Sequence, residues 1–250
     1  MPHAAAIGLS LEENSGTASL RTIVTATAPI LFIAACRSDF AMIAPMSLTL
    51  YDYPRSGHAH RIRLFLSLTG TAYDSVLVDM MKGEHKAADY LKLSPLGQVP
   101  TLVDGNTVIT DSTAALVYLA IKHGDERWLP RDAEGAARVQ RWLSAASAEI
   151  YRGPVIARVG RQFGRDVDLE RADAESTRLF KWMQLELEGR TWLAADHATI
   201  ADIAMYPYIR VADEGGLDLA PYPAILRWLE EVENLEGFEA MPRAGDKTAA

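Results

Sequence analysis

The chain has 250 residues, of which 49% are hydrophobic and 23% are charged, a composition typical of a globular protein with one large core or two ordinary ones. Its formal net charge of −8 argues against nucleic-acid or membrane partners, because proteins that bind phosphate-rich surfaces carry clustered Lys and Arg. Cys36 is the single cysteine, which excludes an intrachain disulfide or a multi-cysteine zinc site. A reducing compartment is favoured, and we expect a cytoplasmic protein.

Residues 1–45 differ from the rest because they mix small residues with an apolar run over 23–36. This run is too short to cross a bilayer, and the leader before it is acidic where a secretory signal would be basic. Residues 33–36 resemble a lipoprotein cleavage box, a short motif that often occurs by chance. We expect translation to begin at Met46 and the preceding segment to be a poorly ordered extension or absent from the native protein.

Strands and helices alternate after Met46. Sequence patterns predict a strand over 47–52, a helix over 61–68 and a short strand over 73–78. A charged segment over 81–93 follows. These elements give the order strand, helix, strand, and the charged segment takes the place of the next helix.

The next part of the chain predicts a hairpin and a capped helix. The Asp-Gly-Asn sequence at 104–106 is a hairpin signal between predicted strands over 101–103 and 107–109. A helix is predicted from Asp111, a natural cap, to about residue 123. The order up to this point is βαβαββα.

Only helical periodicity follows a polar linker that we place at 124–132. One helix is indicated by the spacing of Val139, Trp142, Leu143, Ala146 and Ile150. Further helices are predicted near 170–188, 199–214 and 222–233. We therefore expect an α/β domain at 46–123 and an all-helical domain at 133–243.

Four motifs carry a family resemblance. Residues 53–63 read Tyr-Pro-Arg-Ser-Gly-His-Ala-His-Arg-Ile-Arg, residues 98–100 Gln-Val-Pro, residues 111–112 Asp-Ser, and residues 199–202 Thr-Ile-Ala-Asp. Over 47–243 the chain resembles the glutathione S-transferase superfamily, in particular its bacterial, serine-type, zeta- and theta-like classes. The resemblance implies a thioredoxin-like glutathione-binding domain, an all-helical second domain and a homodimer.

The resemblance places Ser56 at the catalytic position. A thiol with a pKa of about 8.5 is mostly protonated at neutral pH, so a hydroxyl and a helix N-terminus aimed at the sulfur would favour its thiolate. An ordinary helix cap is the structural alternative for this serine. His58 and Tyr53 are rival thiol-activating groups. The pair His58 and His60 has no third ligand in the sequence, and we expect no metal.

The resemblance also implies residues that bind glutathione as co-substrate. Gln98, Val99 and Pro100 match a cis-proline loop in which the backbone of Val99 receives the cysteinyl part like an added strand. Asp111 and Ser112 match the pair that holds the γ-glutamyl group.

Other residues have less specific roles in this interpretation. His85, with Lys86, is a candidate for the glycine carboxylate, although both residues also fit an ordinary charged surface. Thr199 and Asp202 match a capping box with a role in folding.

The second substrate should lie between Ser56 and the helical domain. Candidates to line this cleft are Trp142, Tyr151, Val155 and Phe163, most of which we expect to be core residues; in particular, Trp142 is expected to pack.

We expect a glutathione transferase that activates the glutathione thiol for addition to a small, largely apolar electrophile. One alternative is a zeta-like glutathione-dependent isomerase, which the Arg55-Ser56 and Arg61-Ile62-Arg63 matches suggest, although Gly57 and His58 depart from the usual Ser-Cys continuation. Another is a reductase that uses bound glutathione only. A non-catalytic binding or scaffold module is the alternative of a different class.

Overall fold

The computed structural model describes residues 48–246, and the extension predicted at 1–45, including Cys36, lies outside them. The elements of the first half are β1 (Thr49–Asp52), α1 (Gly57–Leu68), β2 (Asp74–Leu77), the 3-10 helix η1 (Glu84–Lys86), α2 (Ala88–Leu93), β3 (Thr101–Asp104), β4 (Thr107–Ile109) and α3 (Ser112–Lys122). The second half consists of α4 (Ala133–Ile150), the π-helical segment η2 (Tyr151–Val155), α5 (Ile156–Phe163), α6 (Leu169–Glu186), α7 (Ile200–Arg210), the 3-10 helix η3 (Ala212–Gly215) and α8 (Pro223–Glu233).

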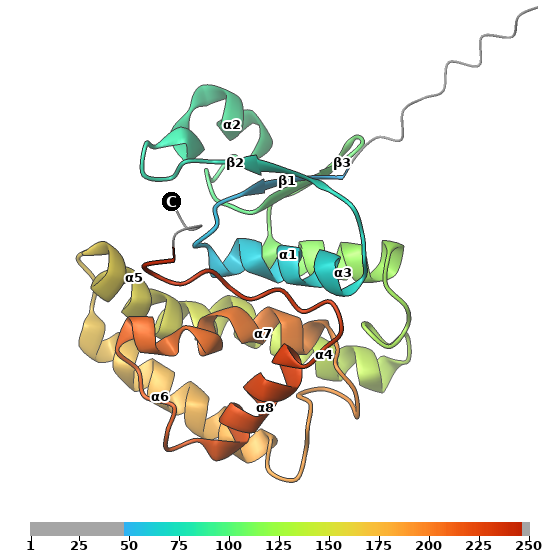
Figure 1. The fold of residues 1–250 in the computed structure, drawn as a ribbon, viewed down its shortest axis with the longest axis vertical. Coiled ribbons are helices and arrows are strands. Elements are labelled where there is room, and N and C mark those ends of the chain that lie inside the picture. The colour runs from blue at the N-terminus through green and yellow to red at the C-terminus, as the bar shows by residue number, and fades with distance from the viewer. Residues whose placement is uncertain (1–47, 247–250) are drawn as a thin grey trace, which may run out of the picture. The chain divides into compact units, whose positions relative to one another are not determined.

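The four strands form one mixed sheet in the order β2-β1-β3-β4. β1 pairs with β2 in parallel and with β3 antiparallel, so Leu50 lies opposite both Ser75 and Leu102. Alternate side chains of β1 face opposite sides of the sheet. Helices α1 and α3 cover one side of the sheet and α2 lies on the other (Figure 1). Leu50 belongs to the main core on the side of α1 and α3, whereas Tyr51 packs on the small cluster that contains Tyr90 of α2.

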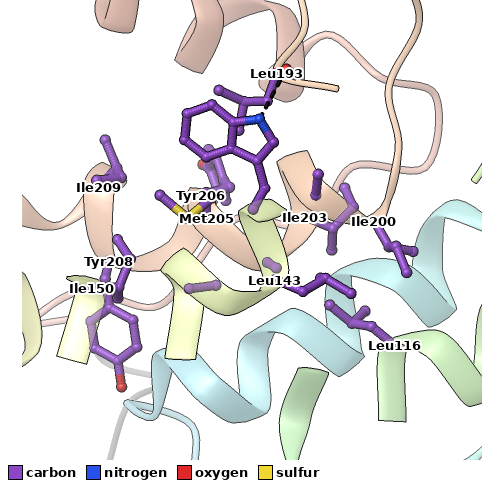
Figure 2. Close-up of a cluster of buried hydrophobic side chains, with 14 of the residues drawn as sticks. Leu116, Leu143, Ile150, Leu193, Ile200, Ile203, Met205, Tyr206, Tyr208 and Ile209 are labelled. Atoms are coloured by element: carbon purple, nitrogen blue, oxygen red, sulfur yellow. Dashed lines mark hydrogen bonds between the residues drawn. The ribbon is translucent and has the colours of Figure 1, made fainter. Parts of the chain in front are cut away.

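Helix α7 joins the two halves of the molecule. It packs on both α1 and α4 (Figure 1). Nearly every side chain along it is buried. Figure 2 shows its residues Ile200, Ile203 and Ile209 in one apolar cluster with Leu116 and Leu143. The core is therefore continuous from the sheet to the helical half, and this fixes the position of one half against the other.

A buried capping box begins α7. Thr199 accepts from the backbone of Ala201, while Asp202 accepts from the backbone and hydroxyl of Thr199, as the sequence predicts. Asp202 also accepts from Leu193 N–H and from Trp228 Nε1. The box therefore ties the loop before α7 and helix α8 to the start of the central helix.

The predicted thioredoxin-like βαβαββα order followed by helices is confirmed, but several limits differ. α1 begins at Gly57, four residues before the predicted start at residue 61, because Ser56 caps it. The helix predicted over 199–214 ends at Arg210 and is followed by η3. The domain limits at 123 and 133 stay predictions.

Sequence patterns predict neither η2 nor α5. Gly153 and Pro154 interrupt the regular pattern, and the chain passes them as a wide π-turn that continues directly from α4 into α5. Proline has no N–H to donate, which makes such a turn a natural way to continue the helix.

The segment after α8 returns to α1. Ser67 donates to the Gly237 carbonyl at 2.6 Å, and Glu239 accepts from Arg63 at 3.2 Å. None of the helices within 48–246 has the length and apolar composition needed to cross a membrane.

Candidate functional site

A cavity of about 680 Å³ lies where the loops of the sheet half face α4, α5 and α7. Its walls include all seven residues predicted to bind or activate glutathione, namely Ser56, His85, Gln98, Val99, Pro100, Asp111 and Ser112. A larger hollow of about 1060 Å³ beside the start of α4 contains none of them. The seven residues come from four separate segments, so the fold brings together what the sequence keeps apart.

Ser56 caps α1 and also lines the cavity. Its Oγ accepts from the N–H of Ala59 at 3.2 Å. A hydroxyl has one donor and two acceptor sites, so this bond leaves its proton for another partner. The cap and the thiol-activating role, which were alternatives in the sequence, are therefore compatible in the structure. The positive end of the α1 dipole lies at the same place.

His58 also lines the cavity, but as a neutral ring. Burial and, to a smaller extent, the charge of Arg61 lower the pKa of His58 to about 3, although Asp111 opposes this shift. Nδ1 lies 3.0 Å from Nη1 of Arg61, which can only donate, so the ring proton is assigned to Nε2. His58 can donate a hydrogen bond to a thiolate but cannot supply a positive charge.

His60 and Tyr53 have different surroundings. His60 is completely buried outside the cavity, where burial lowers its pKa to about 3, and its Nδ1 lies 3.4 Å from Arg63. Tyr53 lines the cavity and packs against the small cluster on the α2 side of the sheet. Within 48–246, no group of three or more His, Cys, Asp or Glu residues is placed to hold a metal ion.

The Gln98-Val99-Pro100 segment enters the cavity just before β3. The Val99–Pro100 peptide is cis, as the family pattern implies. Its position is fixed by the Gln98 carbonyl, which accepts from Tyr90 Oη at 2.7 Å and Ser94 Oγ at 3.0 Å. The side chain of Val99 is buried, so this part of the wall is formed largely by backbone.

Asp111 and Ser112 meet a buried arginine at the start of α3. Oδ1 of Asp111 caps the helix by accepting from Ala114 at 2.8 Å. Burial would raise the pKa of Asp111, but hydrogen bonds from Thr113 and Ala114 and the charge of Arg61 hold it below its usual value. Ser112 Oγ accepts from Arg61 Nη1 at 2.9 Å and so keeps its own proton available.

Arg61 is the residue that organises this corner, and sequence reasoning did not single it out. It is 1% exposed, and besides Ser112 and His58 its guanidinium binds the carbonyls of Ala146 and Ala204. Burial lowers the pKa of Arg61 to about 10, so it stays charged at neutral pH. The sequence signals that could have identified it were an arginine inside an apolar helix pattern and its place in the Arg61-Ile62-Arg63 family match.

Tyr208 is the second residue that sequence reasoning missed. It comes from α7, lines the cavity and lies with its ring 4.9 Å from that of His58. A side chain at Gly57 would meet this ring, because a Cβ there would lie 2.6 Å from Cε2. Burial raises the pKa of Tyr208, while nearby Arg61 and other groups oppose this shift. Figure 2 shows its hydroxyl pointing away from the apolar cluster.

His85 lines the cavity from η1. Burial, followed by Lys86 and Arg165, lowers the pKa of His85, so the neutral ring is favoured. Lys86 is directed elsewhere, because its Nζ donates to the Leu96 carbonyl at 3.0 Å. Of this predicted pair, only His85 reaches the cavity wall.

The wall on the helical side is formed by η2 and α5. Tyr151, Val155 and Phe163 line it, together with Arg158. Trp142 does not: it is 1% exposed, donates to the Leu193 carbonyl at 3.0 Å and stacks on Trp182. The prediction that Trp142 packs in the core is confirmed.

Two family models match the chain. Residues 46–121 match the family model "Glutathione S-transferase, N-terminal domain", and residues 153–236 match "Glutathione S-transferase, C-terminal domain". The chain is 32% identical over 210 residues to glutathione S-transferase Z1 of Arabidopsis thaliana, covering 78% of this chain and 91% of that protein.

Two solved structures are similar over most of the chain. One, described as a possible glutathione S-transferase from Rhodopseudomonas palustris, has a TM-score of 0.70 at 32% identity and covers 78% of this chain and 97% of that one. The other is a glutathione transferase homologue of Drosophila mojavensis with bound glutathione, with a TM-score of 0.69 at 27% identity, covering 76% of this chain and 88% of that one.

Proposed function

The chain belongs to the glutathione S-transferase family, and from this premise we propose that it activates the thiol of glutathione through Ser56 for addition to a small electrophile. The observation that carries the proposal is the Ser56 hydroxyl, which caps α1 as an acceptor and keeps its proton for a partner in the cavity. The homodimer implied by the resemblance is part of this proposal.

Activation means that the thiolate is stabilised relative to the thiol. Each unit by which the pKa of the thiol falls requires about 1.4 kcal/mol of preferential stabilisation. The Ser56 proton, the N-terminus of α1 and the neutral Nε2–H of His58 are donors of the right kind at this end of the cavity. A lowering of one or two units is within their combined reach.

The γ-glutamyl group would lie at the start of α3. Its carboxylate would accept from the Ser112 hydroxyl, with the charge of Arg61 behind it, and its ammonium would face Asp111. The hydrogen bonds that keep Asp111 ionised support this role.

The remaining parts of the tripeptide would follow the loop before β3. The backbone of Val99 would pair with the cysteinyl unit, as an added strand pairs with a sheet edge. His85 would donate to the glycine carboxylate as a neutral ring. Gln98 supports this geometry through its backbone carbonyl, which is held by two hydroxyls.

In the reaction, the thiolate sulfur would form a bond to an electrophilic carbon. The electrons of the bond that breaks would leave with a leaving group or enter an adjacent unsaturated system, and the thiol proton would go to solvent. The product would be a thioether of glutathione. Because Ser56 acts through hydrogen bonding, it would not be consumed.

A glutathione-dependent isomerase is the second candidate. It is supported by the similarity to zeta-class relatives and by the Arg55-Ser56 and Arg61–Arg63 matches. Such an enzyme adds and then releases glutathione, so it would consume none, whereas a transferase consumes one molecule for each product.

The test is a turnover assay with glutathione and chlorodinitrobenzene, comparing the wild type with Ser56→Ala. We expect thioether formation by the wild type and a loss of about tenfold or more in kcat/KM for the variant, the effect of one hydrogen bond to a charged group. Equal activity of the two proteins would contradict a role for Ser56, and an inactive wild type that binds glutathione would favour the isomerase or a binding module.

A further inference from the structure

The second-substrate end of the cavity is cationic. The residues that line the whole cavity include four arginines, Arg55, Arg61, Arg158 and Arg165, and one carboxylate, Asp111. Asp111 and Arg61 both lie at the predicted glutathione end, which leaves Arg55, Arg158 and Arg165 and no carboxylate among the other residues that line the cavity. A wall of this kind does not fit the largely apolar electrophile expected from the sequence.

Arg158 is a buried arginine with an incomplete set of partners. It is 3% exposed; its Nε donates to Glu214 at 2.7 Å, and its Nη1 donates to the backbone carbonyl of Arg55 at 2.8 Å. Within residues 48–246, its buried Nη2 has no hydrogen-bond partner. Glu214 balances the positive charge of Arg158, and a second guanidinium lies against the same ring, that of Phe163.

That second guanidinium belongs to Arg55, the residue before Ser56. Its buried Nε and Nη2 have no hydrogen-bond partner in the described part of the chain. The group lies 4.6 Å over the ring of Phe163, and Arg158 lies 5.8 Å from the same ring. Within residues 48–246 no hydrogen bond to the Arg55 guanidinium competes with a ligand, while Arg158 fixes the Arg55 backbone carbonyl.

We propose that the second substrate is an aromatic electrophile that carries a carboxylate, which Arg55 binds beside Arg158 while the ring packs on Phe163 and Tyr151. Planar guanidinium groups bind carboxylates through paired charge-assisted hydrogen bonds, and buried N–H groups without partners favour such a ligand. Tyr151 is 52% exposed although it lines the cavity, so it offers an unpacked ring face. This inference rests on the proposed function and names the substrate class for the same site.

The reaction would be a substitution on the ring. In an electrophile whose ring carries a halogen, the glutathione sulfur forms a bond to the carbon that bears this halogen. The carbon–halogen bond breaks, and halide leaves with its electron pair. The thiol proton goes to solvent, so no further reactant is needed. The carboxylate takes no part in the bond changes and serves only to bind and orient the substrate.

The experiment compares chlorodinitrobenzoate with the matching chlorodinitrobenzamide, which differ in one ring substituent: a charged carboxylate in the first and an uncharged amide in the second. For each compound, kcat/KM is divided by the rate constant of the uncatalysed reaction with glutathione. The ratio of this normalised value for the benzoate to that for the benzamide is then compared between the wild type and the variants. The variants are Arg55→Gln and Arg55→Lys. Arg152→Gln is the matched control, because Arg152 is an exposed arginine on η2 that is absent from the cavity wall.

We expect a ratio of about ten or more in the wild type, a fall of about tenfold in Arg55→Gln, partial recovery in Arg55→Lys and the wild-type ratio in Arg152→Gln. A ratio near one in the wild type, or one that Arg55→Gln leaves unchanged, overturns the inference but not the proposed function. Calorimetric titration with glutathione separates the two, because a chain that does not bind glutathione refutes both.

Discussion

Replacing Gly57 with alanine tests whether the start of α1 is fixed by the ring of Tyr208. By helix propensity alone, a Gly→Ala change within a helix stabilises a protein by up to about 1 kcal/mol. Here the added Cβ would lie 2.6 Å from Cε2, 2.7 Å from Cζ and 3.0 Å from Cδ2 of the ring. Contacts below 3.0 Å require movement, so we expect the opposite sign.

The magnitude follows from how little room the ring has to move. Tyr208 is 6% exposed, with the His58 ring at 4.9 Å and the Arg61 guanidinium at 6.0 Å. Overpacking at such a position typically costs about 1 to 3 kcal/mol. Displacement of α1 would also shift Ser56, so kcat/KM with glutathione should fall together with the free energy of unfolding.

Urea unfolding of Gly57→Ala, Tyr208→Ala and the double variant measures the coupling directly. Without the ring, the Gly57→Ala change should be neutral or stabilising, which gives an interaction energy of about 1 kcal/mol or more in the double-mutant cycle. A Gly57→Ala protein that is at least as stable as the wild type would refute the close approach of Tyr208 to α1.

Two further predictions concern the buried basic groups. The pKa values of His58 and His60 are both about 3 in the folded protein and about 6.5 in the unfolded chain. Between these two values the unfolded chain binds more protons than the folded protein. The free energy of unfolding should therefore fall as the pH drops below 6.5. Each histidine contributes a slope approaching about 1.4 kcal/mol per pH unit, and a flat urea-unfolding profile between about pH 5 and 6.5 would contradict it. Arg61→Met should raise the glutathione Kd about tenfold or more, because it removes the donor to Ser112. Arg61→Lys should recover only part of this loss, because an ammonium group cannot reproduce the planar geometry of the guanidinium. Calorimetric Kd values equal to that of the wild type would contradict the role of Arg61 in glutathione binding.

Much of the fold follows from local signals in the sequence. The period-2 and helical patterns, the hairpin glycine and the caps at Asp111 and Thr199 predicted elements that the structure contains. These signals act over a few residues, so they can be read without knowing the tertiary structure. The π-turn at Gly153 and Pro154 was missed because its geometry depends on Ser176 of α6, whose atoms lie within 3.0 Å of where a Gly153 Cβ would be.

The candidate site was predictable only where it follows short motifs. Ser56 and Ser112 each lie at the start of a helix next to a strand or hairpin, so the family pattern located them. Arg61, Arg158 and Tyr208 act through contacts between distant segments, and the Arg158 bond to the Arg55 carbonyl joins positions 103 apart. Sequence spacing contains no record of such pairs.

The pKa of the glutathione thiol in its complex with the enzyme tests the central claim most directly. It is followed by ultraviolet thiolate absorbance against pH for the wild type and Ser56→Ala, after unfolding curves show that both proteins are folded, since the lost cap itself costs about 1 kcal/mol. We predict a wild-type value at least about one unit below the 8.5 or so typical of a free thiol, and a rise of about one unit or more in Ser56→Ala. The same bound-thiol pKa in both proteins would contradict the assignment of Ser56 as the activating group.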